Sequence, residues 1–148
     1  MKSASLLPPT VLLVDDSRDG LLVRRALLEE QGFTVQIARN GEEGLKLFER
    51  CRFDVVVTDF RMPAMDGVEM IARIRQLTPQ ARIVLLSRAV ETQGLTEENT
   101  GADAVIAKNS AEASHLVRTV KRLARRAPAR RKPAASQLRG RLLARVRA

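Results

Sequence analysis

Residues 54–67 read DVVVTDFRMPAMDG and join a short apolar run to a polar turn. The three valines, Val55–Val57, are typical of a strand covered on both faces, because such a strand needs no alternation of polar and apolar residues. The run ends in Thr58 and Asp59, and the proline and glycine that follow are typical of a turn. The segment therefore predicts a buried strand with a carboxylate at its carboxyl end.

Similar apolar runs lie on either side of this segment. They predict further buried strands at Val11–Val14, Ile83–Leu86 and Ala104–Ala107. The run Thr34–Ala38 alternates more and is expected nearer an edge of the sheet.

The stretches between these runs predict helices. Gly32 is expected to cap the end of the first, Asn40 to cap the start of the second, and Ser110 to precede the last. The expected helices cover residues 18–31, 41–50, 67–77, 92–100 and 111–126. Strand and helix then alternate five times, which predicts an α/β fold: a doubly wound, five-stranded parallel sheet.

Polar side chains follow four of the five predicted strands. They are Asp15 and Asp16, Thr58 and Asp59, Ser87, and Lys108. In an open parallel sheet, ligands bind beyond the carboxyl ends of the strands, so these groups are expected to share one crevice. Three carboxylates in one place repel one another, and a hard divalent cation such as Mg²⁺ relieves that repulsion. Lys108 would neutralise the remaining charge.

Each of these residues also has an ordinary structural explanation. The pair Asp15 and Asp16 is suited to capping the next helix, Asp59 to a turn, and Lys108 to a solvated surface. The joint pattern favours a functional site, because separate turns would otherwise supply compatible groups by chance. His115 and Cys51 lack such partners in the sequence, and both are expected to be structural or solvated.

Composition and charge exclude several other classes of protein. Aromatic residues make up 3% of the chain, which excludes a stacking platform for single-stranded nucleic acid. One cysteine excludes an intramolecular disulfide and is typical of a reducing cytosol, so a cytoplasmic location is expected. The net charge of +9 is uneven: residues 1–117 carry −3 and residues 118–148 carry +12. The basic character is therefore that of a tail.

Four segments together resemble the CheY-like receiver domain of two-component response regulators. They are Val11–Ser17, Asp54–Gly67, Ile83–Ser87 and Gly101–Lys108. The resemblance implies the (βα)5 flavodoxin-like receiver fold over residues 10–126, with an N-terminal extension at 1–9 and a basic linker and tail at 127–148. In that tail, Leu138, Leu142 and Val146 have the spacing of an amphipathic helix.

The resemblance also implies a role for each strand-end residue. Asp59 would accept a phosphoryl group from a sensor histidine kinase or a phosphotransfer protein. Mg²⁺ would be bound directly by Asp16, Asp59 and the main-chain carbonyl of Arg61, and through water by Asp15.

The remaining implications concern the phosphoryl group and the output. Ser87 and Lys108 would contact phosphoryl oxygens. The domain would signal to a downstream protein target, with no enzymatic activity beyond self-catalysed phosphotransfer and autodephosphorylation.

The sequence departs from the family pattern at positions that matter for output. Val105 stands where an aromatic residue usually acts as a rotameric switch, and Asn109 stands where a proline with a cis bond is usual. Arg88 follows Ser87 where a small residue is usual, and with Arg61 it is expected to restrict access to Asp59. The input chemistry is therefore expected to be intact and the readout altered.

Two other functions are open from the sequence. One is an aspartyl-phosphate hydrolase resembling the haloacid dehalogenases, but that class needs Asp-x-Asp on the first strand, and here Asp15 and Asp16 are adjacent. The other is a protein that binds a partner, nucleic acid or an anionic membrane mainly through its basic tail, with phosphorylation secondary.

Overall fold

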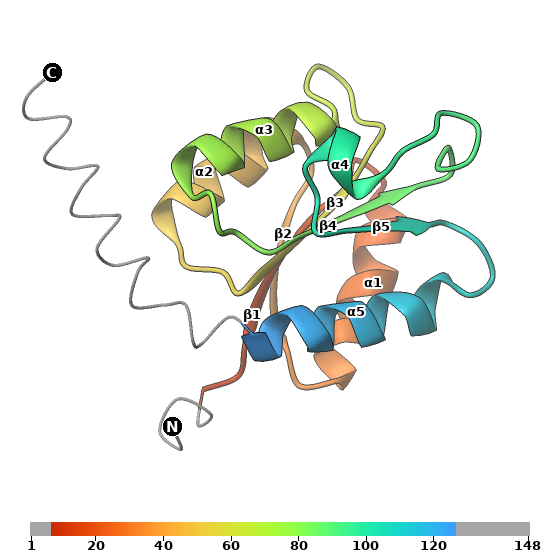
Figure 1. Ribbon diagram of the computed structural model, residues 1–148. Coiled ribbons are helices and arrows are strands. Elements are labelled where there is room, and N and C mark those ends of the chain that lie inside the picture. Colours follow the sequence, from red (N-terminus) through yellow and green to blue (C-terminus); the bar gives the residue numbers. More distant parts are fainter. Residues whose placement is uncertain (1–6, 127–148) are drawn as a thin grey trace, which may run out of the picture.

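A computed structural model describes residues 7–126, and five parallel strands form a single sheet at its centre (Figure 1). The strand order is β2-β1-β3-β4-β5, so β2 and β5 are the edges. The strands are β1 (Thr10–Val14), β2 (Thr34–Ala38), β3 (Val55–Asp59), β4 (Ile83–Ser87) and β5 (Ala104–Ala107). The doubly wound α/β sheet is confirmed, and so is the edge position of β2.

Alternate residues along each central strand face opposite sides of the sheet, which gives the domain two cores. On β1, Val11 and Leu13 belong to the core under α1 and α5, while Leu12 and Val14 belong to the core under α2 and α3. All four are at most 1% exposed. Burial on both faces explains why these strands are continuously apolar in sequence.

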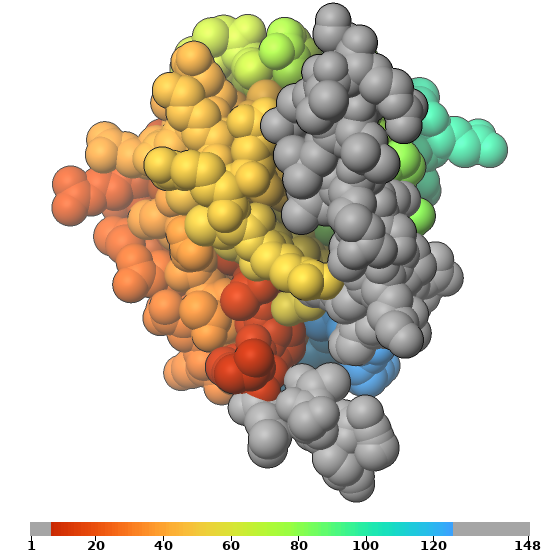
Figure 2. Space-filling model, turned by 90° about the vertical axis from the view of Figure 1, so that its left-hand side faces the viewer, coloured from red at the N-terminus to blue at the C-terminus, as the bar shows by residue number. Residues whose placement is uncertain are grey.

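The helices begin and end where local chemistry satisfies their free backbone groups. Asn40 accepts a hydrogen bond from the backbone nitrogen of Glu43 (2.7 Å), as expected of an N-cap. Gly32 follows the first helix with φ of +96°, a conformation that favours glycine. The helices are α1 (Arg18–Glu30), α2 (Gly41–Arg50), α3 (Gly67–Leu77), α4 (Glu97–Thr100) and α5 (Glu112–Arg126). Figure 2 shows the side of the molecule on which the residues of α2, in orange-yellow, lie at the surface.

The prediction of a helix over residues 92–100 is wrong for its first half. Only α4 is helical, and residues 89–94 form turns that end at Gly94, where φ is +60°. Thr96 then starts a new helix, because its side chain accepts from the Asn99 backbone and the Asn99 side chain accepts in return.

A smaller correction applies at the start of α5. The side-chain oxygen of Asn109 accepts a hydrogen bond from the backbone nitrogen of Ala111 (2.9 Å). Ser110 lies in a turn, and the helix begins at Glu112.

In the part of the chain that the structure describes, no helix has the length and apolar character needed to cross a bilayer. The tail at residues 127–148, with its expected apolar stripe, lies outside the described residues, as do residues 1–6.

Gly67 is the first residue of α3, and its backbone packs closely against the end of β3. A Cβ atom at Gly67 would clash with the carbonyl oxygen of Asp59 and lie 2.9 Å from Cδ1 of Leu85. Replacing Gly67 by alanine should lower the free energy of unfolding by about 2 kcal/mol. Unfolding is best followed by far-ultraviolet circular dichroism, since the chain has no Trp or Tyr.

Gly41→Ala is the matched control, because it also alters the first residue of a helix. The three atoms nearest to its Cβ, at 2.9–3.2 Å, all belong to the flexible side chain of Met65 and not to the backbone, so the neighbour can adjust more easily. Equal losses of stability in the two variants would contradict the account of Gly67.

Candidate functional site

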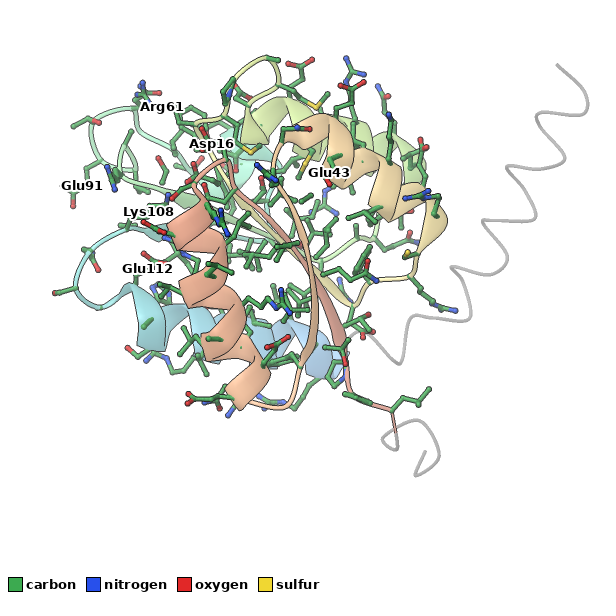
Figure 3. All side chains as sticks on the ribbon, turned by 180° about the vertical axis from the view of Figure 1, so that it is seen from behind. Asp16, Glu43, Arg61, Glu91, Lys108 and Glu112 are labelled. Atoms are coloured by element: carbon green, nitrogen blue, oxygen red, sulfur yellow. The ribbon has the colours of Figure 1, made fainter. Side chains whose placement is uncertain are left out.

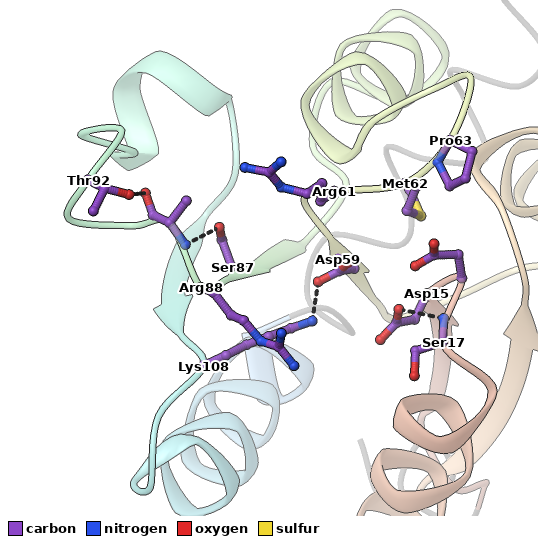
Figure 4. A pocket seen from close by; sticks show the side chains of 12 residues that line it. Asp15, Ser17, Asp59, Arg61, Met62, Pro63, Ser87, Arg88, Thr92 and Lys108 are labelled. Atoms are coloured by element: carbon purple, nitrogen blue, oxygen red, sulfur yellow. Dashed lines mark hydrogen bonds and ion pairs between the residues drawn. The ribbon is translucent and has the colours of Figure 1, made fainter.

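The carboxyl ends of β1, β3, β4 and β5 open into one pocket of about 590 Å³ (Figure 4). The register of the parallel strands aligns these ends: Asp59 of β3 lies opposite Leu86 of β4, and Ser87 of β4 lies opposite Ala107 of β5. Figure 3 shows Asp16, Arg61 and Lys108 at the same end of the molecule. The lining residues include every predicted site residue: Asp15, Asp16, Asp59, Arg61, Ser87 and Lys108. The expectation of a shared crevice is therefore confirmed geometrically.

Three carboxylates form an acidic cluster in this pocket. Asp15, Asp16 and Asp59 each offer an oxygen, and these oxygens lie within 4.8 Å of one another. Asp15 and Asp59 are buried, whereas Asp16 is exposed at the rim. A set of hard oxygen donors with one solvent-facing member fits Mg²⁺, which prefers carboxylates and retains water ligands. Arg61 lines the same pocket.

Burial and the neighbouring charges together determine the pKa of Asp59. Burial raises the pKa of its carboxyl above the ordinary value, and the neighbouring negative charge of Asp15 raises it further. The Lys108 ammonium, which forms an ion pair with Asp59, lowers the pKa, as does Arg24. On balance the pKa of Asp59 is raised. The ionised carboxylate is therefore unfavourable in this pocket, and additional positive charge would stabilise it.

Arg24 was missed by the sequence reasoning. Its Nη1 lies 2.9 Å from Oδ2 of Asp15, and the other oxygen of Asp15 accepts from the Ser17 backbone (2.9 Å). The available signal was helical spacing, because Arg24 shares a stripe with Leu21 and Leu28, both buried in the core under α1. A guanidinium in an otherwise apolar stripe indicates a buried partner.

Ser87 and the loop after it form the opposite wall of the pocket. The Ser87 side-chain oxygen accepts from the Ala89 backbone nitrogen (2.8 Å), which leaves its own O–H available to donate. Arg61 and Arg88 are exposed and line the pocket, and their expected effect on access to Asp59 stays a prediction.

The other residues singled out from the sequence lie as follows. Val105 is partly buried and packs against the core under α2 and α3. The described residues contain no cis peptide bond, so the bond before Asn109 is trans. His115 is exposed on α5, outside the acidic pocket, and Cys51 ends α2 as a partly buried free thiol.

Residues 11–121 match the response regulator receiver domain family, and the chain belongs to it. A response regulator receiver protein of Anaeromyxobacter is 38% identical over 84 residues, covering 57% of this chain and 35% of its own length. The transcriptional regulatory protein AfsQ1 of Streptomyces coelicolor is 36% identical over 115 residues, covering 76% of this chain and 45% of its own. The match thus spans less than half of either relative.

Solved receiver domains have the same fold. The Francisella response regulator 1452 receiver domain superposes with a TM-score of 0.73 at 28% identity, covering 80% of this chain and 98% of its own. The response regulator TrrA of Thermotoga maritima, solved in complex with Mg²⁺ and beryllofluoride, gives 0.71 at 30% identity, covering 78% and 98%. The chain is therefore a phospho-accepting receiver domain of the two-component type, a signalling domain.

The raised pKa of Asp59 predicts how stability depends on pH. Ionised Asp59 reduces the stability of the fold above its pKa, and this penalty disappears as the pH falls through that raised value and the carboxyl becomes neutral. Asp59→Asn, which is neutral at every pH, should therefore unfold at higher urea concentration than the parent at pH 7, without divalent cations. The advantage should shrink as the pH falls toward 4.

Asp19→Asn is the control, because Asp19 is an exposed acid on α1. It should not gain stability at pH 7. An Asp59→Asn variant less stable than the parent at pH 7 would show that the ion pair with Lys108 outweighs the cost of burial.

Proposed function

We propose that Asp59 is the residue that accepts the phosphoryl group. It lies at the carboxyl end of β3, buried in the acidic pocket beside Lys108. In the transfer, an oxygen of Asp59 bonds to phosphorus as the phosphorus–nitrogen bond of a donor phosphohistidine breaks. The departing imidazole nitrogen keeps the electron pair, so no oxidant or further reactant is needed.

The surrounding residues supply position and charge. Lys108, which pairs with Asp59, would contact one phosphoryl oxygen, and the Ser87 O–H, which is free to donate, would hydrogen-bond to another. Asp16, Asp59 and the main-chain carbonyl of Arg61 would hold Mg²⁺ directly, with Asp15 contributing through water. When bound, Mg²⁺ neutralises charge on the phosphoryl oxygens. The single observation that carries this proposal is the cluster of three carboxylates beside a lysine.

The wider function follows from the family. We propose a receiver spanning residues 10–126 that acts in the cytoplasm, takes its phosphoryl group from a sensor histidine kinase or phosphotransfer protein, and signals by binding a downstream protein. Its only catalysis would be its own phosphorylation and dephosphorylation. A hydrolase of the dehalogenase type is disfavoured by the family match. Function mainly through the basic tail concerns residues outside the described part, and the relatives give it no support.

Phosphorylation should require both Asp59 and a divalent cation. After incubation with a small acyl-phosphate donor and Mg²⁺, intact mass spectrometry should show one added phosphate on the parent and none on Asp59→Asn. A chelator should abolish the addition. Asp19→Asn serves as the matched acid-to-amide control and should be phosphorylated like the parent.

Two results would contradict this assignment: phosphorylation of Asp59→Asn at the parent's level, or phosphorylation that the chelator leaves unchanged. A histidine kinase should be tested beside the small donor, because Arg61 and Arg88 line the pocket and are expected to restrict the small donor even where a kinase succeeds.

Val105 should limit how far the structural change caused by phosphorylation extends from Asp59 toward β5 and α5. A valine has one strongly preferred rotamer and no ring to move between buried and exposed positions. Relative to the protein with Mg²⁺ alone, adding beryllofluoride should change backbone amide shifts strongly near Asp59 and only weakly in β5 and over residues 111–120. Changes in β5 and α5 as large as those beside Asp59 would refute a dampened switch.

A further inference from the structure

Arg24 connects the acidic cluster to a helix that begins far along the chain. Its guanidinium donates from Nη1 to Oδ2 of Asp15 (2.9 Å). It also donates to both carboxylate oxygens of Glu112, from Nε (2.6 Å) and from Nη2 (3.2 Å). Glu112 is the first residue of α5 and lies beside α1 (Figure 3). The three side chains are 12%, 3% and 16% exposed, so solvent screens them only weakly.

Gly20 makes room for this arrangement. A Cβ atom at Gly20 would lie 2.7 Å from Nη1 of Arg24 and 2.8 Å from Oδ2 of Asp15. Any side chain in this position would occupy the space where the guanidinium meets the carboxylate. Glycine inside a helix costs about 1 kcal/mol relative to alanine, and here its lack of a side chain is what permits the contact.

The charge of Arg24 also acts on Asp59, with which it is not paired, and lowers the pKa of that carboxyl. Burial lowers the pKa of Arg24 itself, but the hydrogen bond and charge of Glu112, followed by the charges of Asp15 and Asp59, raise it more. Among the described residues, Asp15 is paired with Arg24 and Asp59 with Lys108, while Asp16 has no ion pair. Two of the three acids that would serve a metal ion are thus already opposed by cations of the chain.

Glu112 determines how strongly Arg24 opposes a metal ion. While Glu112 pairs with the guanidinium from the α5 side, its negative charge offsets part of the Arg24 charge that acts on the cluster. Without the Glu112 charge, the guanidinium pairs with Asp15 alone, and its full positive charge repels a metal ion at the cluster. Without Arg24, both Asp15 and Glu112 are uncompensated, and the cluster attracts a cation more strongly.

Given the function proposed above, on which this inference rests, we propose that Arg24 is a positioning residue through which the start of α5 and the Mg²⁺ affinity of the acidic cluster are coupled. The coupling is reciprocal. Mg²⁺ bound at the cluster repels the guanidinium and so strengthens its pairing with Glu112. Conversely, a protein that binds Glu112 at the start of α5 leaves the guanidinium paired with Asp15 alone, which weakens Mg²⁺ binding. The connection does not pass through Val105.

Calorimetric titration of the full chain with MgCl₂ at constant ionic strength tests the signs. Arg24→Met should bind Mg²⁺ about fivefold more tightly than the parent and Glu112→Gln about fivefold more weakly. The double variant should lie close to the parent, because it removes both charges together. Arg25→Met is the matched control: Arg25 lies on the same helix, but pairs with the exposed Glu29, and its loss should leave Mg²⁺ affinity unchanged.

A second measurement separates coupling from a structural effect. In the parent, Mg²⁺ should shift the backbone amide resonances of residues 15–17 and also of residues 111–115. In Arg24→Met the shifts at 15–17 should persist and those at 111–115 should vanish. Circular dichroism checks that each variant is folded, and the opposite sign expected of Glu112→Gln does not depend on the folding of Arg24→Met.

The results distinguish this inference from the proposed function. Equal Mg²⁺ affinities in the parent, Arg24→Met and Glu112→Gln, or α5 shifts that persist without Arg24, would overturn the coupling and leave the metal site intact. Failure of the parent to bind Mg²⁺ would overturn the metal site and the coupling with it. Phosphorylation of Asp59 is assessed separately by mass.

Discussion

Like charges held close together in a partly buried pocket are the constraint on which this domain depends. The carboxyl ends of parallel strands all lie on the same side of the sheet. Three carboxylates meet there, and their oxygens lie within 4.8 Å of one another. Such a cluster is costly unless positive charge offsets it. The chain supplies two cations, Lys108 on Asp59 and Arg24 on Asp15, and leaves Asp16 exposed. What remains is a site at which further positive charge is favourable, as the proposed binding of Mg²⁺ and phosphorylation require.

Most of the fold and the predicted site followed from the sequence because both depend on strand ends. Continuously apolar runs identified four strands, and the alternating run identified the edge strand β2. Once the strands are parallel, the residue after each strand lies at a common edge, whatever its position in the chain. This is why Asp15, Asp59 and Lys108, far apart in sequence, were expected together and line one pocket.

The parts that the sequence did not reveal depend on contacts between elements. Residues 92–100 carry a weak helical pattern, and the turn ending at Gly94 and the new cap at Thr96 shorten α4 to one turn. In the sequence Arg24 is one of three arginines of α1, and only the tertiary structure shows that α5 places Glu112 beside it. A strand end can be located from local sequence, whereas an ion pair spanning 88 positions requires the tertiary structure.

The most direct test of this account is a carbon-13 NMR titration of the Asp59 carboxyl, with and without Mg²⁺. Without the metal, the account predicts a midpoint above the ordinary range for an aspartate, because burial and Asp15 oppose ionisation more than Lys108 and Arg24 favour it. With Mg²⁺, the midpoint should fall, since the cation stabilises the ionised form. An ordinary midpoint that Mg²⁺ does not move would contradict the claim that the cluster is an electrostatically unsatisfied site.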